Sequence, residues 1–75
     1  MAEGVMYEVV EVGQGWVLRR AGRAPLVEFP TEIQAVRAGL AVCRDEGVSR
    51  LVIRRGSGGV EEIDPRLLPG NALEV

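Results

Sequence analysis

The chain has 75 residues with one cysteine and no histidine, and its formal net charge at pH 7 is −2. A chain of this length forms one domain, and it buries only about 60% of the surface that its unfolded form exposes, so its stability is marginal without further support. One thiol excludes an intrachain disulfide, and without imidazole it cannot make the ligand sets of structural zinc. Self-association is the remaining support, and we expect a homodimer or a higher oligomer.

A reducing compartment fits the single cysteine, which has no disulfide partner. The opening residues 1–4 (Met-Ala-Glu-Gly) lack the basic region and apolar run of a signal peptide. No apolar stretch approaches the roughly 20 residues that a membrane span requires. We therefore expect a cytoplasmic protein with no membrane partner. All nine basic residues are arginine, which favours a GC-rich genome.

A hairpin is predicted over residues 5–20. The β-branched run 5–12 predicts the first strand, and a bulge or strong twist near Val9 and Val10 would explain its imperfect alternation. The turn Gly-Gln-Gly at 13–15 leads to a second strand at 16–20. A short extended segment at 26–29 predicts a third strand, and the preceding proline suits an edge position.

The helix has the strongest local signals. Thr31 and Gln34 have the spacing of a capping box, and Gly47 is a natural stop. A stripe of apolar residues recurs every three or four positions and is expected to face the sheet: Ile33, Val36, Leu40 and Cys43. Gly39 in the middle of the helix costs roughly 1 kcal/mol relative to alanine, which indicates that another backbone approaches closely there.

The remainder of the chain predicts two further strands and a tail. An apolar run at 51–53 is typical of a central strand, and the glycine-rich turn 56–59 leads into a last strand at 60–63. Asp64 and Pro65 predict an N-cap and one helical turn through Leu68. The sequence therefore predicts one α+β domain over 1–75, a small antiparallel sheet of four to five strands with one helix on one face, in the order ββ(β)αββ.

One helix covers only one face of such a sheet. The residues expected beneath the helix are Trp16, Leu18, Phe29, Leu51 and Ile53. The other face is expected to carry charged residues, whose cross-strand pairs contribute a few tenths of a kcal/mol each: Arg19, Glu28, Arg54 and Glu62. A shift of one residue in register would exchange the two faces.

Three motifs follow one another along the chain: Gly-Trp-Val-Leu-Arg at 15–19, a helix that opens Thr-x-x-x-Ala at 31–35, and Leu-Val-Ile-Arg-Arg-Gly at 51–56. Together they resemble the small bacterial family of domain of unknown function 2188, over about residues 7–63. That family often has histidine before its first strand residues and Asp-Gly in the final turn, where this chain has Tyr7 and two glycines. The resemblance implies a fold and carries no catalytic residues.

The usual groups of an active site are missing from the sequence. There is no histidine to serve as base for a serine or for Cys43, which lies on the apolar stripe of the helix and is interpreted as a core or interface residue. The glycine turns at 13–15 and 56–59 could cradle phosphate, but neither is followed by a helix, so both are interpreted as hairpin turns. We expect no enzyme, no catalytic residue and no cofactor.

A carboxylate cluster near a loop, formed by Glu61, Glu62 and Asp64, could bind a hard cation weakly, but a solvated edge or arginine partners are the simpler interpretation, so no metal site is predicted. A second group, Arg19, Arg20, Arg54 and Arg55, ends two strands that are expected to be neighbours and could contact phosphates. The net charge of −2 and the absence of lysine oppose nucleic-acid binding.

Four aliphatic residues lie in the segment 65–75, which is too apolar for a free tail: Leu67, Leu68, Leu73 and Val75. They pack either across their own domain or against a second copy, and we assign them to a candidate subunit interface. The sequence therefore predicts a homo-oligomeric module for protein–protein interaction. The alternative is nucleic-acid or anion binding through the arginine cluster.

Overall fold

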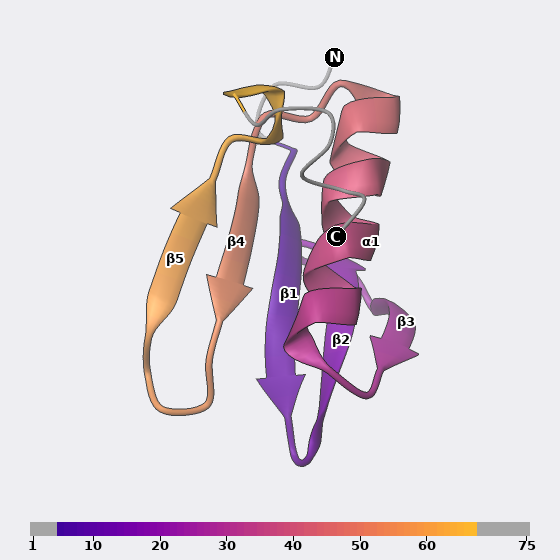
Figure 1. Ribbon diagram of the computed structural model, residues 1–75. Coiled ribbons are helices and arrows are strands. Elements are labelled where there is room, and N and C mark those ends of the chain that lie inside the picture. Colours follow the sequence, from indigo (N-terminus) through magenta and orange to yellow (C-terminus); the bar gives the residue numbers. More distant parts are fainter. Residues whose placement is uncertain (1–4, 68–75) are drawn as a thin grey trace.

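The computed structural model describes residues 5–67, with the side chains of Leu26 and Leu67 excepted. The elements follow in the order β1 (Tyr7–Val12), β2 (Gly15–Arg20), β3 (Pro25–Phe29), α1 (Glu32–Glu46), β4 (Leu51–Arg54), β5 (Val60–Ile63) and the 3-10 helix η1 (Pro65–Leu67). One helix packs on a five-stranded sheet (Figure 1). The predicted α+β class and the order ββ(β)αββ are confirmed.

The first strand lies at the centre of the sheet, whose spatial order is β3-β2-β1-β4-β5. Three of the four pairings are antiparallel, as predicted, but β1 and β4 run parallel, so the sheet is mixed. The cause is the number of elements between them. Three elements, β2, β3 and α1, lie between the two strands, and each successive element runs opposite to the one before it. The fourth reversal, at β4, therefore restores the direction of β1.

Local capping chemistry sets both ends of α1, as predicted. The Thr31 hydroxyl accepts a hydrogen bond from the backbone N–H of Gln34 at 3.2 Å, which satisfies one of the unpaired donors of the first turn. Gly47 adopts the left-handed conformation, with φ 72°, and its N–H donates to the carbonyl of Cys43. That conformation is easiest for glycine, so the helix ends there.

The face of α1 that meets the sheet is built mostly from small residues. The buried helix residues are Ala35, Gly39, Leu40 and Cys43. Ile33, which the spacing places in the stripe, is instead 66% exposed. A Cβ added at Gly39 would lie 3.0 Å from Cδ1 of Leu51. The close approach predicted at Gly39 is therefore real, but it is made by leucine side chains of the sheet rather than by backbone.

The two sheet faces are as predicted. Beneath the helix lies a core to which every inner strand contributes, chiefly Tyr7, Val9, Leu18, Leu51 and Ile53. Of the bulge or strong twist predicted near Val9 and Val10, the bulge is wrong, because β1 pairs with β2 without interruption from Tyr7 to Val12. Side chains alternate regularly along β1, and valines lie on both faces of the sheet. The one register shift among the described strand pairs lies between Leu18 and Arg19, where β2 pairs with β3.

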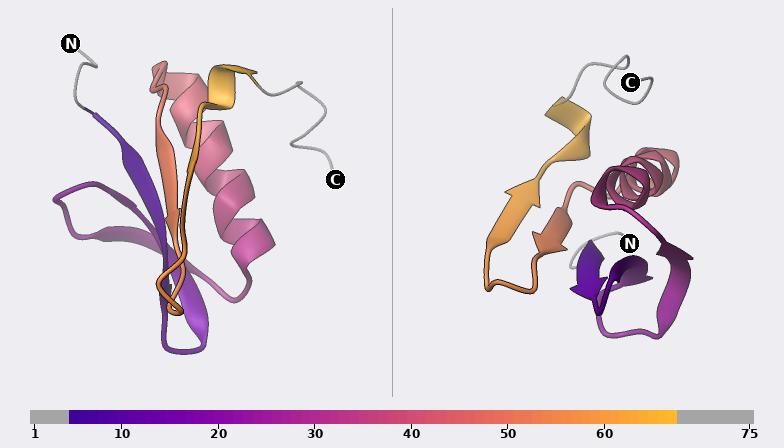
Figure 2. Two further views of the ribbon diagram at one scale, coloured as in Figure 1. Left: turned by 90° about the vertical axis from the view of Figure 1, so that its left-hand side faces the viewer. Right: turned by 60° about the horizontal axis from the view of Figure 1, so that its bottom comes forward.

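No described element covers the second face of the sheet. Figure 2 shows α1 on one side of the strands, with η1 on the same side. The helix lies over β1 and β2 and does not extend across β5 (Figure 1). This placement leaves two surfaces within residues 5–67 that no other element covers: the outer face of the sheet, and a groove between α1 and β5.

Candidate interaction surface

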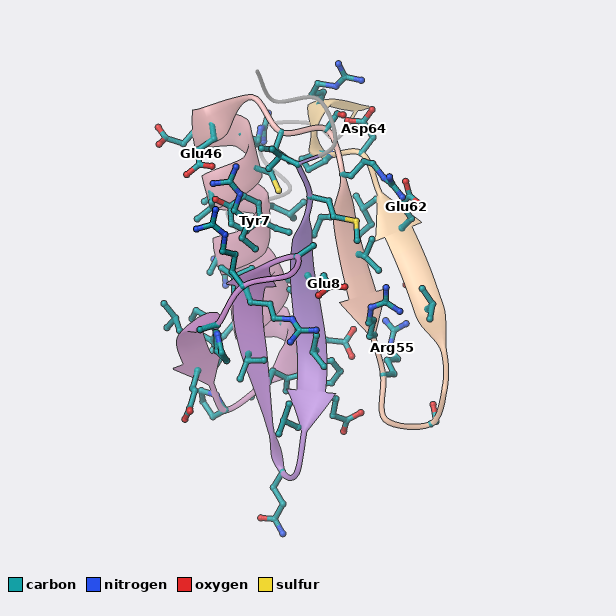
Figure 3. The ribbon with its side chains drawn as sticks, turned by 180° about the vertical axis from the view of Figure 1, so that it is seen from behind. Tyr7, Glu8, Glu46, Arg55, Glu62 and Asp64 are labelled. Atoms are coloured by element: carbon teal, nitrogen blue, oxygen red, sulfur yellow. The ribbon has the colours of Figure 1, made fainter. Side chains whose placement is uncertain are left out.

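The outer face of the sheet is defined by the alternation of its strands and by their register. Its residues are Glu8, Val10, Val12, Val17, Arg19, Glu28, Val52, Arg54, Val60 and Glu62, and Arg50 joins them at the start of β4. We call this set the open face. It is the surface on which the sequence predicts Arg19, Glu28, Arg54 and Glu62, and Figure 3 views the molecule from this side.

A buried carboxylate lies at the centre of the open face. Glu8 comes from the central strand, and only 6% of its side chain is exposed, although no layer covers it. Its Oε1 accepts a hydrogen bond from Nε of Arg19 and its Oε2 accepts one from Nε of Arg54, each at 2.8 Å. The two arginines come from β2 and β4, on either side of β1, and their guanidinium groups shield the carboxylate from water.

The charge of Glu8 is maintained by its partners. Burial alone would raise the pKa of this carboxyl group, but the hydrogen bonds and positive charges of Arg54 and Arg19 outweigh it and lower the pKa below 4.5. The carboxylate is thus ionised at neutral pH. Two guanidinium groups share one negative charge, so this triad carries a local charge of +1.

Around the triad the open face is balanced in charge. Arg50 donates from Nε to Oε2 of Glu62 at 2.9 Å, at the edge formed by β5. Glu28 on the opposite edge makes no ion pair with any residue in the described range 5–67. Three arginines and three glutamates occupy the face, and its net charge is therefore zero. Exposed apolar area comes from Val12 and Val60, which are 57% and 60% exposed.

The four arginines expected to act together are divided between the two faces. Arg19 and Arg54 belong to the open face, whereas Arg20 lies opposite Tyr7 on the helix side. Arg55 binds Glu32 at the start of α1 at 2.8 Å and Glu61 at 3.2 Å. Adjacent residues of a strand point to opposite faces, so neither Arg-Arg pair forms one cluster. Three of these four arginines are already paired with carboxylates.

The carboxylates that the sequence places near the last loop have arginine partners. Glu61 binds Arg55 and Glu62 binds Arg50, while Oδ2 of Asp64 accepts a hydrogen bond from Arg66 at 2.9 Å. The hydrogen bonds of Arg66 also lower the pKa of Asp64. Within the described range no group of three or more His, Cys, Asp and Glu side chains could hold a metal ion.

Cys43 is enclosed in the core. Its side chain is fully buried, and its thiol lies 3.8 Å from the carbonyl oxygen of Arg50, to which it donates. Burial, with a smaller contribution from the charge of Glu46, raises the pKa of the thiol to about 11. A thiol with this pKa is almost fully protonated at neutral pH and is a poor nucleophile.

A second surface is the groove between α1 and the outer strands. Ile33, Val36 and Leu40 form its helix wall, and Ile53 and Ile63 form its sheet wall. Its volume is about 370 Å³. Arg37 and the ion-paired side chains of Arg55, Glu32 and Glu61 form the rest of its lining. Sequence reasoning misses this groove, because it assigns Ile33 to the core.

The aliphatic residues of the predicted C-terminal interface fall at the limit of the described structure. The backbone of Leu67 belongs to η1, and Leu68, Leu73 and Val75 lie outside the described residues. Sequence reasoning also misses Glu8, which reads only as an interruption of the first strand. The signal that could have identified it is its position, because a carboxylate flanked by strand residues on a central strand is buried and then requires charged partners.

Comparisons with family models, with curated proteins and with solved structures find no match to this chain. The resemblance to the family of domain of unknown function 2188 therefore stays a prediction. No helix in the described range is long and apolar enough to cross a membrane.

Proposed function

We propose that this domain is a non-catalytic self-association module in which the open face of one copy packs against the same face of a second copy. The observation that carries the proposal is the composition of that face. It combines exposed valines with equal numbers of arginines and glutamates around a buried carboxylate. A small domain without disulfide support gains the burial that it lacks by covering this face.

Charge complementarity favours a second copy as the partner. In a two-fold symmetric pair each surface meets itself in reversed orientation, so an electroneutral face can oppose its arginines to the glutamates of the other copy. Glu28 has no ion-pair partner among residues 5–67, and the Arg19–Glu8–Arg54 triad carries one positive charge in excess. These groups supply the complementary charges.

The size of the face sets the expected affinity. Five strands of four to six residues, at about 3.3 Å per residue and about 4.8 Å apart, cover roughly 400 Å² per copy. Two copies then bury about 800 Å², which is below the roughly 1,000 Å² of a typical specific interface. We therefore expect a weak dimer with a dissociation constant of micromolar order or higher rather than an obligate complex.

Analytical ultracentrifugation over protein concentrations from about 1 μM to about 1 mM tests the proposal, because this range brackets a micromolar constant. The mass should rise from the 8.1 kDa of one chain to twice that value. Val60→Asp should raise the dissociation constant at least about tenfold, since it places a charge in the apolar contact. Val27→Asp is the matched control, because Val27 is 49% exposed but lies on the helix side.

A chain that stays monomeric throughout this range would exclude self-association. Equal effects of Val60→Asp and Val27→Asp would show that association does not use the open face. Near-ultraviolet circular dichroism of the single tryptophan, Trp16, verifies that each variant keeps the native fold.

One observation favours anion or nucleic-acid binding as the second candidate function. Arg19 and Arg54 each donate to Glu8 through Nε and are 38% and 45% exposed, so the shared carboxylate holds two guanidinium groups side by side. Phosphate recognition uses such groups. Binding of a short DNA or RNA duplex that weakens with salt and is lost in Arg54→Gln would support this candidate.

Further assignments rest on the sequence alone. We propose a bacterial, cytoplasmic protein related to the family of domain of unknown function 2188. The order of the three motifs supports the relationship, and the single buried thiol is compatible with a reducing compartment.

A further inference from the structure

We infer that the groove between α1 and β5 is the binding site for residues 68–75 of the same chain. The groove is lined on both walls by aliphatic side chains, and Ile33 on its helix wall is 66% exposed in the described part of the protein. Ile33 lines this groove together with Val36, Leu40, Ile53 and Ile63, and apolar side chains grouped in this way mark a surface that another apolar segment covers.

The path of the chain delivers the segment to this groove. Pro65 is buried and η1 packs against α1, on the helix side of the sheet (Figure 2). The chain therefore leaves Leu67 on the side where the groove lies. A link that begins this close gives the following residues an effective concentration of the order of millimolar, which favours binding within the chain over binding to a second copy.

The segment 68–75 is long enough to reach the far end of the groove. Eight residues in extended conformation span up to roughly 26 Å. The 15-residue helix α1 is about 22 Å long, so the segment can return along the whole helix as far as Ile33. Half of the segment is aliphatic, at Leu68, Ala72, Leu73 and Val75, and Glu74 is its one charged side chain. Its composition thus suits the aliphatic walls of the groove.

This site is separate from the open face, since the two lie on opposite sides of the sheet. The proposal assigns the four aliphatic residues of the C-terminal segment to their own domain, where they extend its core. It therefore holds whether or not the open face binds a second copy.

Nuclear magnetic resonance of the full-length protein tests the assignment. In uniformly labelled protein we expect nuclear Overhauser effects between the methyl groups of Leu73 or Val75 and those of Ile33 or Ile63. In a mixture of labelled and unlabelled protein, an isotope-filtered experiment detects contacts between different chains only, and these signals should be absent. Signals in the filtered experiment would overturn the proposal in favour of a second copy, and their absence from both experiments would overturn it altogether.

Thermal unfolding gives an independent measurement. Leu73→Asp should lower the melting temperature by at least about 6 °C, the smallest shift expected from the loss of one buried leucine side chain in a domain of this size. Asn71→Asp adds the same charge to the same segment without removing an apolar group, and it should leave the melting temperature unchanged. Equal shifts for the two variants, or no shift for Leu73→Asp, would contradict the proposal.

Discussion

The hydroxyl of Tyr7 donates a hydrogen bond of 2.6 Å to Oε1 of Glu46, and this bond joins the start of the central strand to the last residue of the helix. This bond gives a structural role to a glutamate at the C-terminus of the helix. A glutamate there is otherwise unfavourable, because its charge repels the negative end of the helix dipole. At this position Glu46 is the hydrogen-bond partner of a buried phenol. Figure 3 shows the two labelled residues near the same end of the molecule.

Replacing Tyr7 by phenylalanine should lower the free energy of unfolding by about 1 kcal/mol, the contribution of one hydrogen bond whose acceptor can be hydrated after the change. Glu46→Gln keeps an acceptor and should cost less. Chemical denaturation monitored by circular dichroism measures both. A neutral effect of Tyr7→Phe would show that the bond contributes nothing to stability.

Alkaline pH should weaken the native state through the same residue. The hydrogen bond to Glu46, burial and the negative charge of Glu46 together raise the pKa of Tyr7 above 10.0. The folded protein then holds the phenolic proton more tightly than the unfolded chain, so this contribution to stability is complete below pH 10 and is lost as pH rises through the folded pKa. Because Tyr7 is the single tyrosine, ultraviolet titration reports it directly. Ionisation at or below pH 10 in the folded protein would contradict the assignment.

Glu8→Gln should destabilise the protein by about 1.5–3 kcal/mol, since it removes two charge-assisted hydrogen bonds and leaves two guanidinium groups against an uncharged amide. The matched control is Glu62→Gln, which breaks the exposed pair with Arg50 and should cost less than about 1 kcal/mol. Denaturant titration of both variants measures the difference. Equal decreases in the free energy of unfolding would show that Glu8 contributes no more to stability than Glu62 does.

The lowered pKa of Glu8 also predicts that the stability of the native protein decreases at acid pH. The pKa of Glu8 is lower in the folded protein than its ordinary value of 4.5, so its contribution is complete above that pH and is lost as pH falls through the folded pKa. We expect the stability of the native protein to decrease below pH 4.5 more steeply than that of Glu8→Gln. Parallel pH profiles of the two proteins would contradict this prediction.

Gly39→Val should destabilise the protein by about 2–3 kcal/mol, because the added methyl groups would overlap the buried ends of Leu51 and Leu18. Ala41→Val is the control, since Ala41 is exposed on the same helix and the change there costs less than about 0.7 kcal/mol in helix propensity. Thermal or chemical unfolding measures the two effects. A similar cost at both positions would exclude tight packing at Gly39.

Cys43 should react with thiol reagents only when the protein opens. Its side chain is buried and the pKa of its thiol is raised to about 11, so both access and ionisation are unfavourable in the native state. The chain contains no other thiol, and labelling therefore reports this residue alone. Reaction should be slow in buffer and rapid in denaturant, and equally fast labelling under both conditions would refute the buried position.

The parts of the fold that local chemistry determines are predictable from the sequence. Thr31 and Gly47 act through neighbours a few residues away, so the limits of α1 follow from local spacing. The assignment of Leu18 and Arg19 to opposite faces follows from strand alternation, which the pairing of β1 with β2 confirms. The same rule places Arg19 and Arg20 on opposite faces, so strand alternation alone is sufficient to divide the predicted arginine cluster.

What the sequence does not predict depends on contacts between distant segments. The burial of Glu8 requires arginines from both neighbouring strands, and nothing local identifies β4 as the second neighbour of β1. The size and spacing of Ile33 suit a buried stripe and favour a place in the core. In the structure Ile33 lies on the wall of the groove, and the buried contact with Leu51 and Leu18 is made at Gly39 instead.

The central position of β1 has a consequence for how the molecule is made. The carboxylate of Glu8 has both of its partners only after Arg54 has been synthesised, 46 positions later in the chain. During synthesis the first strand and its hairpin leave the ribosome with one edge unpaired, and that edge is completed only when β4 emerges. We expect folding to be a single late event dominated by non-local pairing, slow for a chain of this size. A nascent chain arrested before residue 50 would then expose the edge of β1 that pairs with β4 in the folded protein, and unpaired strand edges promote aggregation.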